Sequence, residues 1–188
     1  MPLNLPNLLT WLRIALIPLF VGIFYFEHSL VTPPNQNLAA TIIFTAAAVT
    51  DWLDGWLARK LDQTSAFGAF LDPVADKLMV AAALIILVQL GRLDAIIALI
   101  IVGREITISA LREWMAGIGA GKSVAVSMLG KIKTISQMVA IPLLLYSDPV
   151  GFLNPLQVGT WLIYVAEVLT LVSMAYYLKA ALPLAWGK

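Results

Sequence analysis

The sequence contains no cysteine and a single histidine, His28. Disulfide bonds and thiolate chemistry are therefore excluded, and the cysteines or clustered histidines typical of a zinc site are absent. Charged residues are also scarce, because they make up 12% of the 188 residues, whereas soluble domains carry about 25%. The net charge of +1 at pH 7 gives no sign of a nucleic-acid-binding surface. The chain has too little polar surface to cover a soluble globule of its size.

Long apolar runs are what the sequence has instead, since 61% of its residues are hydrophobic. A helix of about 20 apolar residues crosses the roughly 30 Å of a bilayer's hydrocarbon core. We predict an all-α polytopic membrane protein with one domain, residues 1–188, and six transmembrane helices. The predicted spans are 8–26, 38–57, 68–90, 95–115, 124–146 and 158–179. The segment 27–37, with Pro33 and Pro34, is interpreted as the turn after the first span.

The distribution of the cations predicts the orientation of the spans. Six spans place both termini on one side, and with that side cytoplasmic the cations gather there. They are Arg13, Arg59, Lys60, Lys77, Arg104, Arg112, Lys122, Lys131, Lys133, Lys179 and Lys188. Only Arg92 falls in an outward connection, together with Glu27, Asp94 and Asp148. We therefore predict that the N- and C-termini are cytoplasmic.

Two stripes of acidic and small residues end on this cytoplasmic side. In the second span they recur at i, i+3, i+4 and i+7, and in the third at i, i+4 and i+8, so each stripe occupies one helix face. The residues are Asp51, Asp54, Gly55 and Ala58 in the second span, and Gly68, Asp72 and Asp76 in the third. Because the connection between the spans is short, we expect the two acidic faces to converge on one cleft.

Four carboxylates in a partly dehydrated cleft repel one another unless a cation neutralises them. All-oxygen ligation favours Mg²⁺ or Mn²⁺. The small residues leave room for a bulky ligand beside the carboxylates, and Arg59 at the edge suits a phosphate. Asp62 is interpreted as a solvated residue at a helix end and is left out of this site.

The pattern Asp51-x2-Asp54-Gly55-x2-Ala58-Arg59-x8-Gly68-x3-Asp72-x3-Asp76 resembles the motif of the CDP-alcohol phosphotransferase family, with every fixed position filled. Six spans also fit this family over essentially the whole chain. The stretches "NLLTWLR", "GAFLDPVADK", "REITISALREW" and "GKIKT" are similar to those of its bacterial phosphatidylglycerophosphate synthases.

This resemblance implies transfer of the phosphatidyl group from CDP-diacylglycerol to sn-glycerol 3-phosphate, with release of CMP. It implies that Asp51, Asp54 and Asp72 hold the metal ions, usually two, and that Asp76 completes the cluster and is the candidate general base. It implies a CDP site lined by Gly55, Ala58, Arg59 and Gly68. It also implies a homodimer in the bacterial inner membrane, with the active site facing the cytoplasm.

The chemistry of that reaction agrees with these residue types. A pyrophosphate must have its charge neutralised before it is attacked, and two metal ions that bridge its oxygens do this. The attacking group is a primary alcohol, so a nearby carboxylate must accept its proton. Direct displacement needs no covalent intermediate; a double displacement through an aspartate nucleophile is the alternative.

A second group of charges is expected to bind the dianionic phosphate of the acceptor. It comprises Arg104, Arg112, Lys131 and Lys133, with Glu105 beside them. Arg104 lies within an apolar run, where a charge is costly without a partner. Asn7, Thr10 and Arg13 recur at helical spacing near the start of the chain, and the resemblance suggests that they approach the nucleotide.

The sequence is open to three other interpretations. Within the family, another acceptor such as inositol phosphate, serine or another alcohol would leave the chemistry unchanged. A cation transporter would need acidic groups near the bilayer midplane and access from both sides, whereas here they gather at one end. The segment "AGIGAGKS" lacks the first glycine of a P-loop, because Ala116 stands there, and it follows a predicted helix rather than a strand.

Overall fold

The structure is a computed structural model that describes residues 5–27, 30–61, 66–119 and 128–185. These residues form six α-helices and one short 3-10 helix, and no strand occurs among them. The helices are α1 (Leu5–Gly22), η1 (Ile23–Tyr25), α2 (Pro33–Leu61), α3 (Ala66–Gln89), α4 (Ala95–Gly117), α5 (Met128–Tyr146) and α6 (Pro155–Ala185). The prediction of an all-α fold is confirmed.

One predicted boundary was wrong, because residues 33–37, which were assigned to the turn before the second span, belong to α2. That helix begins at Pro33. Proline is well suited to the first turn of a helix, where its missing N–H would have no intrahelical partner. Gln36, two residues after Pro34, donates hydrogen bonds from Nε2 to the carbonyls of Ile23 and Phe26, both at 3.1 Å. The Gln36 side chain therefore connects the first turn of α2 to the residues just after α1. The predicted start of the fifth span, at residue 124, lies outside the described residues.

Other helix ends follow the local chemistry of the sequence. Gly91 lies just after α3 with φ +69°, and its N–H bonds to the carbonyl of Val88 while that of Arg92 bonds to Leu87. This is the Schellman arrangement that ends a helix on a left-handed glycine. Asp94 caps α4, with Oδ1 accepting the N–H of Ile96 at 2.7 Å. α3 ends at Gln89, within one residue of the predicted end of the third span at residue 90.

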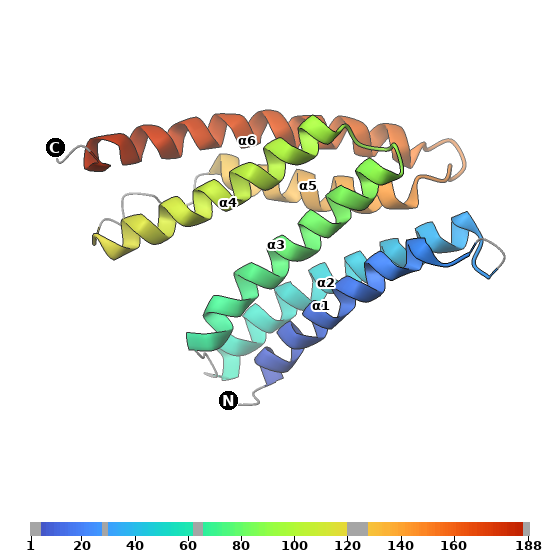
Figure 1. The fold of residues 1–188 in the computed structure, drawn as a ribbon, viewed down its shortest axis with the longest axis horizontal. Helices are drawn as coiled ribbons and strands as arrows, with labels where there is room; N and C mark the ends of the chain where they lie inside the picture. Colours follow the sequence, from blue (N-terminus) through green and yellow to red (C-terminus); the bar gives the residue numbers. More distant parts are fainter. Residues whose placement is uncertain (1–4, 28–29, 62–65, 120–127, 186–188) are drawn as a thin grey trace.

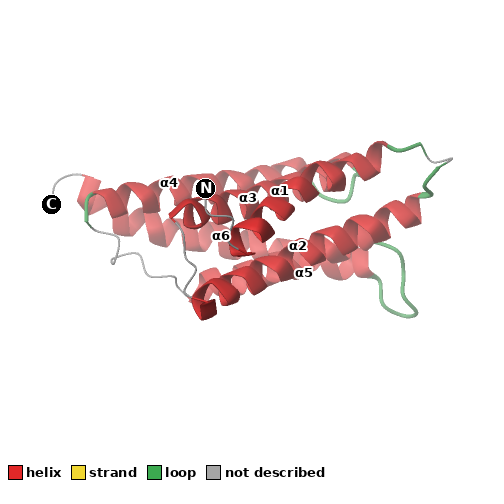
Figure 2. Ribbon diagram, turned by 90° about the horizontal axis from the view of Figure 1, so that it is seen from below, coloured by secondary structure: helices red, strands yellow, loops and turns green. Residues whose placement is uncertain are grey.

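In Figure 1, α6 runs along the long axis of the molecule, and α1, α2 and α3 run obliquely to it. α1 packs against both α2 and α3, and α6 packs against α4 and α5. Contacts of α2 with α5 and of α3 with α4 and α5 join the two groups. Figures 1 and 2 show both termini toward the end that also holds the last turns of α2 and α4. The opposite end holds the connections α1–α2, α3–α4 and α5–α6 (Figure 2). We call these the terminal end and the loop end.

The core between the helices is apolar. Each helix contributes to it at least one side chain that is at most 1% exposed: Phe20, Phe44, Leu84, Ile101, Leu144 and Ile163. α5 and α6 approach each other closely at Gly159, where an added Cβ would lie 2.9 Å from Cγ of Leu144 and 3.1 Å from the carbonyl of Ala140. A small residue at a helix crossing lets two backbones come together in this way.

Large apolar side chains also cover the outside of the bundle. Exposed examples from the six helices are Leu19, Ile42, Ile85, Leu99, Ile135 and Val168. Among the described residues, Leu8–Tyr25 and Pro155–Lys179 are long and apolar enough to cross a membrane. A soluble monomer rarely exposes so much apolar surface, so the bundle has the character of a membrane protein.

The loop end is held together by Arg92. Its guanidinium donates to the carbonyls of Leu144 at 3.2 Å and Leu145 at 2.7 Å, near the end of α5, and to Oδ1 of Asn37 at 2.9 Å on α2. Burial lowers the pKa of Arg92, and the charge of Asp148 opposes that shift. The charge of Arg92 is favourable at the carboxyl end of α5. Its hydrogen bonds connect α5 to the start of α2 at the end opposite the acidic stripes.

Candidate active site

Three helices bring acidic and basic side chains together at the terminal end. Arg13 of α1 is 1% exposed, and its Nη1 lies 2.9 Å from Oδ1 of Asp51 on α2 and 3.1 Å from Oδ1 of Asp76 on α3. Because one nitrogen contacts both carboxylates, the acidic faces of α2 and α3 converge at this point. The predicted convergence of the two stripes is therefore seen for Asp51 and Asp76, and α1 supplies a cation between them.

A second contact from α1 reaches the other acidic residue of α3. Thr10, which is buried, donates a hydrogen bond from Oγ1 to Oδ1 of Asp72. Thr10 and Arg13 lie three residues apart, so they share a face of α1. That face lies against the aspartates, which is where the sequence predicted an approach to the nucleotide; the contact with a nucleotide stays a prediction.

Some predicted site residues lie where the structure describes only the backbone. Asp54, Gly55, Ala58 and Arg59 belong to α2 and Asn7 belongs to α1, but their side chains are outside the description. Gly68 is buried in the first turns of α3. The backbone of α2 places the four residues within two turns of Asp51. Their roles at the site therefore remain predictions.

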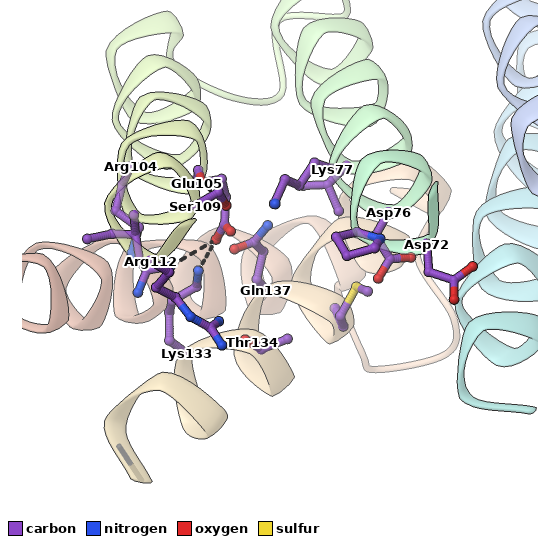
Figure 3. Close-up of a pocket in the computed structure, with 14 residues that line it drawn as sticks. Asp72, Asp76, Lys77, Arg104, Glu105, Ser109, Arg112, Lys133, Thr134 and Gln137 are labelled. Atoms are coloured by element: carbon purple, nitrogen blue, oxygen red, sulfur yellow. Dashed lines mark hydrogen bonds and ion pairs between the residues drawn. The ribbon is translucent and has the colours of Figure 1, made fainter. Parts of the chain in front are cut away.

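A cavity of about 350 Å³ extends from the aspartates of α3 to the basic residues of α4 and α5 (Figure 3). Its volume is within the range of small-molecule sites. The residues that line it are Asp72, Pro73, Asp76, Lys77 and Val80 of α3, Arg104, Glu105, Ile108, Ser109 and Arg112 of α4, and Lys133, Thr134, Gln137 and Met138 of α5. In Figure 3 the carboxylates of Asp72 and Asp76 lie on one side and Arg104, Arg112 and Lys133 on the other.

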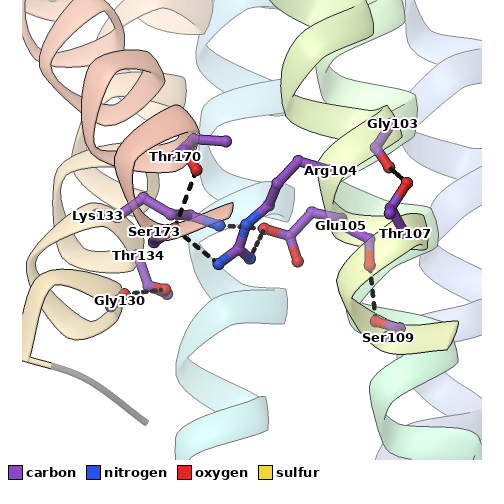
Figure 4. A network of polar contacts seen from close by, with 10 residues as sticks. All are labelled: Gly103, Arg104, Glu105, Thr107, Ser109, Gly130, Lys133, Thr134, Thr170 and Ser173. Carbon is purple, nitrogen blue, oxygen red and sulfur yellow. Dashed lines mark hydrogen bonds and ion pairs between the residues drawn. The ribbon is translucent and has the colours of Figure 1, made fainter. Parts of the chain in front are cut away.

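The basic side of the cavity is organised around Glu105. Its Oε1 pairs with Nζ of Lys133 and lies 3.4 Å from Nη1 of Arg104 (Figure 4). Lys133 is 3% exposed and Arg104 is 9% exposed. A buried cation is costly unless it is paired, so Glu105 accounts for how two cations can remain beside each other at this depth.

Arg104 is also fixed from the far side by α6. Its Nη2 donates to Oγ of Ser173 at 2.9 Å, and Ser173 in turn donates to the carbonyl of Thr170 at 3.0 Å (Figure 4). The guanidinium carbon lies 5.9 Å from the centre of the Tyr177 ring, within the range of a cation–π interaction. These contacts hold the guanidinium at the cavity wall.

The other two predicted phosphate ligands differ in position. Arg112 is exposed but lines the cavity, whereas Lys131 is exposed and is not among the lining residues. Helical spacing explains the difference, because Lys131 and Lys133 are two residues apart and point to different faces of α5. The structure thus gives Lys133 and Arg112 a place at the cavity and gives Lys131 none.

Comparison with known proteins decides the family. The sequence model of the CDP-alcohol phosphatidyltransferases matches residues 3–172. The chain belongs to this family.

Two relatives of this CDP-alcohol phosphatidyltransferase illustrate the similarity. A protein of Shigella flexneri serotype 5b (strain 8401) is 49% identical over 183 residues, and one of Escherichia coli (strain K12) is 48% identical over the same length. Each alignment covers 96% of both chains, and both relatives are named CDP-diacylglycerol–glycerol-3-phosphate 3-phosphatidyltransferase. The family resemblance inferred from the aspartate motif is confirmed.

The residues of this CDP-alcohol phosphatidyltransferase suit a hard divalent cation. The family generally depends on such an ion. Among the side chains that the structure describes, no three acidic, histidine or cysteine residues form a ready metal cluster, and Asp54 is outside that set. The donors that converge near Arg13 and Thr10 are nevertheless all carboxylate oxygens, the ligand type of Mg²⁺ and Mn²⁺. The donor chemistry fits the ion.

Sequence reasoning missed several polar residues of the site. Gln137 and Thr134 line the cavity, and Ser173 and Tyr177 hold Arg104. A signal was available for Gln137, because it follows Lys133 by four residues and so shares its helix face. Ser173 and Tyr177 are also spaced by four, but only the packing of α6 on α4 shows what they face.

Proposed function

We propose that this chain transfers the phosphatidyl group of CDP-diacylglycerol to sn-glycerol 3-phosphate, giving phosphatidylglycerophosphate and CMP. The relatives that match nearly the whole chain are named for this activity. The observation that carries the proposal is the single cavity lined by Asp72 and Asp76 on one side and Arg104, Arg112 and Lys133 on the other. The acidic side of this cavity would bind the metal ions that contact the pyrophosphate of the donor. Its basic side would bind the phosphate of the acceptor.

The cationic side would bind the acceptor. The phosphate of sn-glycerol 3-phosphate is a dianion, which arginine binds through paired donors and lysine through its point charge. Arg104, Arg112 and Lys133 supply these groups; Lys131 stays a prediction that the cavity does not support. With the phosphate on this side, the primary hydroxyl at the other end of the acceptor points toward the aspartates of α3.

The transfer step needs a base and a leaving group. The hydroxyl oxygen forms a bond to the phosphorus of the phosphatidyl group, and its proton passes to Asp76. The bond from this phosphorus to the bridging oxygen breaks, and CMP departs with the electron pair. A positioned carboxylate that accepts the proton is general base catalysis, typically worth about 10²–10⁴-fold in rate. No covalent enzyme intermediate is required.

The acidic side would bind the donor. We assign Asp51, Asp54, Asp72 and Asp76 to Mg²⁺ or Mn²⁺, with two ions as the family resemblance implies. Bound there, the ions would neutralise the charge of the pyrophosphate. Gly55, Ala58, Arg59 and Gly68 would line the CDP site, together with Asn7, Thr10 and Arg13 of α1. The burial of Thr10 and Arg13 against the aspartates supports this placement of α1.

Two alternatives make different predictions. Another acceptor of the same reaction, such as serine, carries no phosphate dianion for the three cations to bind. Inositol phosphate does carry one, and only an assay separates it from glycerol 3-phosphate. A cation transporter needs acidic groups near the middle of the bundle. The contacts of Asp51, Asp72 and Asp76 are instead with the first half of α1, at the terminal end.

We further propose that all six helices span the bacterial inner membrane, with the termini and the active site facing the cytoplasm. The support is the exposed apolar surface of every helix together with the gathering of charges at the terminal end. A homodimer stays a prediction from the family resemblance, which light scattering of the purified protein would test.

The activity is tested with purified protein in detergent, labelled CDP-diacylglycerol, Mg²⁺ and a panel of alcohols, by measuring CMP. We expect CMP with sn-glycerol 3-phosphate, loss of it with EDTA, and its return with Mg²⁺ or Mn²⁺. CMP with inositol phosphate alone would contradict the acceptor, and no CMP with any alcohol would contradict the enzyme.

The base is tested with Asp76→Asn, which should abolish turnover and leave binding of CDP-diacylglycerol largely intact. Asp94→Asn is the matched control, because Asp94 caps α4 at the loop end and asparagine caps a helix equally well. Residual turnover by Asp76→Asn near the level of that control would show that Asp76 is not the base.

A further inference from the structure

Gln137 is a buried polar residue whose hydrogen bonding is incomplete. It lies on α5, is 5% exposed and lines the cavity. Within the described part of the chain, no group donates a hydrogen bond to its side-chain carbonyl oxygen, Oε1. An unpaired buried acceptor typically costs about 1–3 kcal/mol, and native structures contain few of them. An acceptor left open in the wall of a cavity suggests that a ligand supplies the donor.

The position of Gln137 indicates which part of a ligand this would be. Gln137 follows Lys133 by four residues, so the two side chains share one face of α5. In Figure 3 Gln137 lies between the basic group around Glu105 and Lys133 and the aspartates of α3. A ligand that binds the basic group through its phosphate can reach Asp76 with its reacting hydroxyl. The central part of such a ligand lies beside Gln137.

The neighbouring hydroxyl groups do not satisfy this acceptor. Thr134 donates to the carbonyl of Gly130 at 2.9 Å, and Ser109 donates to the carbonyl of Glu105 at 2.7 Å. Each hydroxyl has one proton to donate, and in both residues a helix carbonyl of the same chain accepts it. Oε1 of Gln137 therefore depends on a donor from outside these side chains.

We propose that Gln137 is a specificity residue that recognises the secondary hydroxyl of the acceptor. Its Oε1 accepts a hydrogen bond from a hydroxyl on the carbon between the phosphate-bearing and the attacking carbons. This inference rests on the proposed function, because it takes the phosphate to bind near Lys133 and the primary hydroxyl to react near Asp76. The class of substrate it selects is a vicinal polyol phosphate, as opposed to a simple hydroxyalkyl phosphate.

We therefore expect the protein to prefer sn-glycerol 3-phosphate over an analogue that lacks only the secondary hydroxyl. A site built to pair a substrate hydroxyl discriminates against the analogue that lacks it, because the protein group is then left unpaired. 3-Hydroxypropyl phosphate has the phosphate and the primary hydroxyl of sn-glycerol 3-phosphate but lacks the secondary hydroxyl. We expect the wild-type protein to prefer sn-glycerol 3-phosphate by about 10- to 100-fold in kcat/KM.

The test compares both acceptors, by CMP release, in the wild type, Gln137→Met and Thr134→Val. Methionine has a similar size and no strong acceptor, so Gln137→Met should reduce the preference to within about threefold. It should do so mainly by slowing the reaction with sn-glycerol 3-phosphate. Thr134→Val removes another polar group from the same cavity wall and should keep the wild-type preference, whatever its overall rate.

The outcomes separate this inference from the proposed function. Equal use of the two acceptors by the wild type, or an undiminished preference in Gln137→Met, would overturn the role of Gln137 while leaving the transferase activity in place. A loss of preference in Thr134→Val equal to that in Gln137→Met would also overturn it. Absence of CMP release by the wild type with either acceptor would instead contradict the proposed function itself.

Discussion

At the scale of single residues, Arg13 links the two halves of the aspartate motif. It is almost fully buried, and one of its nitrogens contacts both Asp51 and Asp76. A buried cation between two carboxylates neutralises their repulsion, and a guanidinium is also the preferred side-chain partner of a phosphate. Arg13 therefore holds the two aspartates together, and in the proposed function it would also contact the pyrophosphate of CDP-diacylglycerol.

The first prediction concerns Arg13→Ala. Arg13→Ala would remove two charge-assisted contacts and leave Asp51 and Asp76, whose side chains are 33% and 36% exposed, to repel each other without a cation between them. We expect kcat/KM for CDP-diacylglycerol to fall at least about 100-fold, since 1.4 kcal/mol is tenfold, and the melting temperature in detergent to fall as well. The measurements are CMP release over a range of CDP-diacylglycerol concentrations and a thermal melt.

Lys60→Ala is the control for this variant. Lys60 is also a cation of the terminal end, but it is exposed on the last turns of α2. An exposed cation contributes little to stability, so both measurements should stay close to the wild type. Similar losses of kcat/KM and melting temperature in the two variants would show that any cation at the terminal end has this effect. The contacts of Arg13 with Asp51 and Asp76 would then not be its cause.

At the scale of helices, the acceptor side of the cavity depends on a contact between α4 and α6. Arg104 belongs to α4, but its hydrogen bond to Ser173 and its contact with the Tyr177 ring come from α6. Neither residue of α6 lines the cavity. Their role would thus be to position Arg104 without touching a substrate.

The second prediction is that Ser173→Ala weakens binding of the acceptor and leaves the donor site unchanged. A hydrogen bond to a charged group is worth about 1.5–3 kcal/mol. We expect KM for sn-glycerol 3-phosphate to rise about tenfold or more, with KM for CDP-diacylglycerol unchanged. Steady-state kinetics with each substrate varied in turn gives both constants.

Thr160→Val provides the matched control on α6. The hydroxyl of Thr160 donates only within its own helix among the described contacts, to the carbonyl of Leu156 at 2.7 Å. Its loss should change neither KM. An equal rise in both constants for Ser173→Ala would indicate a general disturbance of the bundle, and no rise at all would show that Ser173 does not position Arg104.

The helices and the acidic cluster were predictable from sequence because they depend on local patterns. Apolar runs predicted all six helices, and helical spacing placed Asp51 and Asp76 on faces that converge. The pairing partners were not predictable, because Arg13 and Asp76 are 63 residues apart and meet only through the packing of α1 on α3. Gln137 was missed for another reason: a neutral amide in an apolar helix becomes significant only when its burial and its open acceptor are known.

At the scale of the whole molecule, the two ends of the bundle differ in charge. The terminal end carries the aspartates, the cavity and most of the cations, whereas Arg92 at the loop end is bonded to the carbonyls of α5. Between the ends, the outer surface is apolar. This distribution suits a bundle that spans a bilayer with its terminal end in the cytoplasm, since cations are enriched on that side.

The third prediction tests this orientation, and the absence of cysteine makes the test simple. Phe152, in the α5–α6 connection at the loop end, is fully exposed, and Ile118, just after α4 at the terminal end, is 50% exposed. We expect a membrane-impermeant maleimide to label Phe152→Cys in intact spheroplasts and Ile118→Cys only in inverted membrane vesicles. Labelling is read by mass shift, and the unmodified chain, which has no thiol, is the background control.

The pattern of labelling distinguishes the possible arrangements. The reverse pattern would show that the termini face outward, which would move the cavity away from cytoplasmic substrates and contradict the proposed site of action. Labelling of both residues from the same side would mean that the segment between them crosses the membrane an even number of times. It would then be α5, the helix that carries Lys133 and Gln137, that fails to span, and the six-span prediction would be wrong.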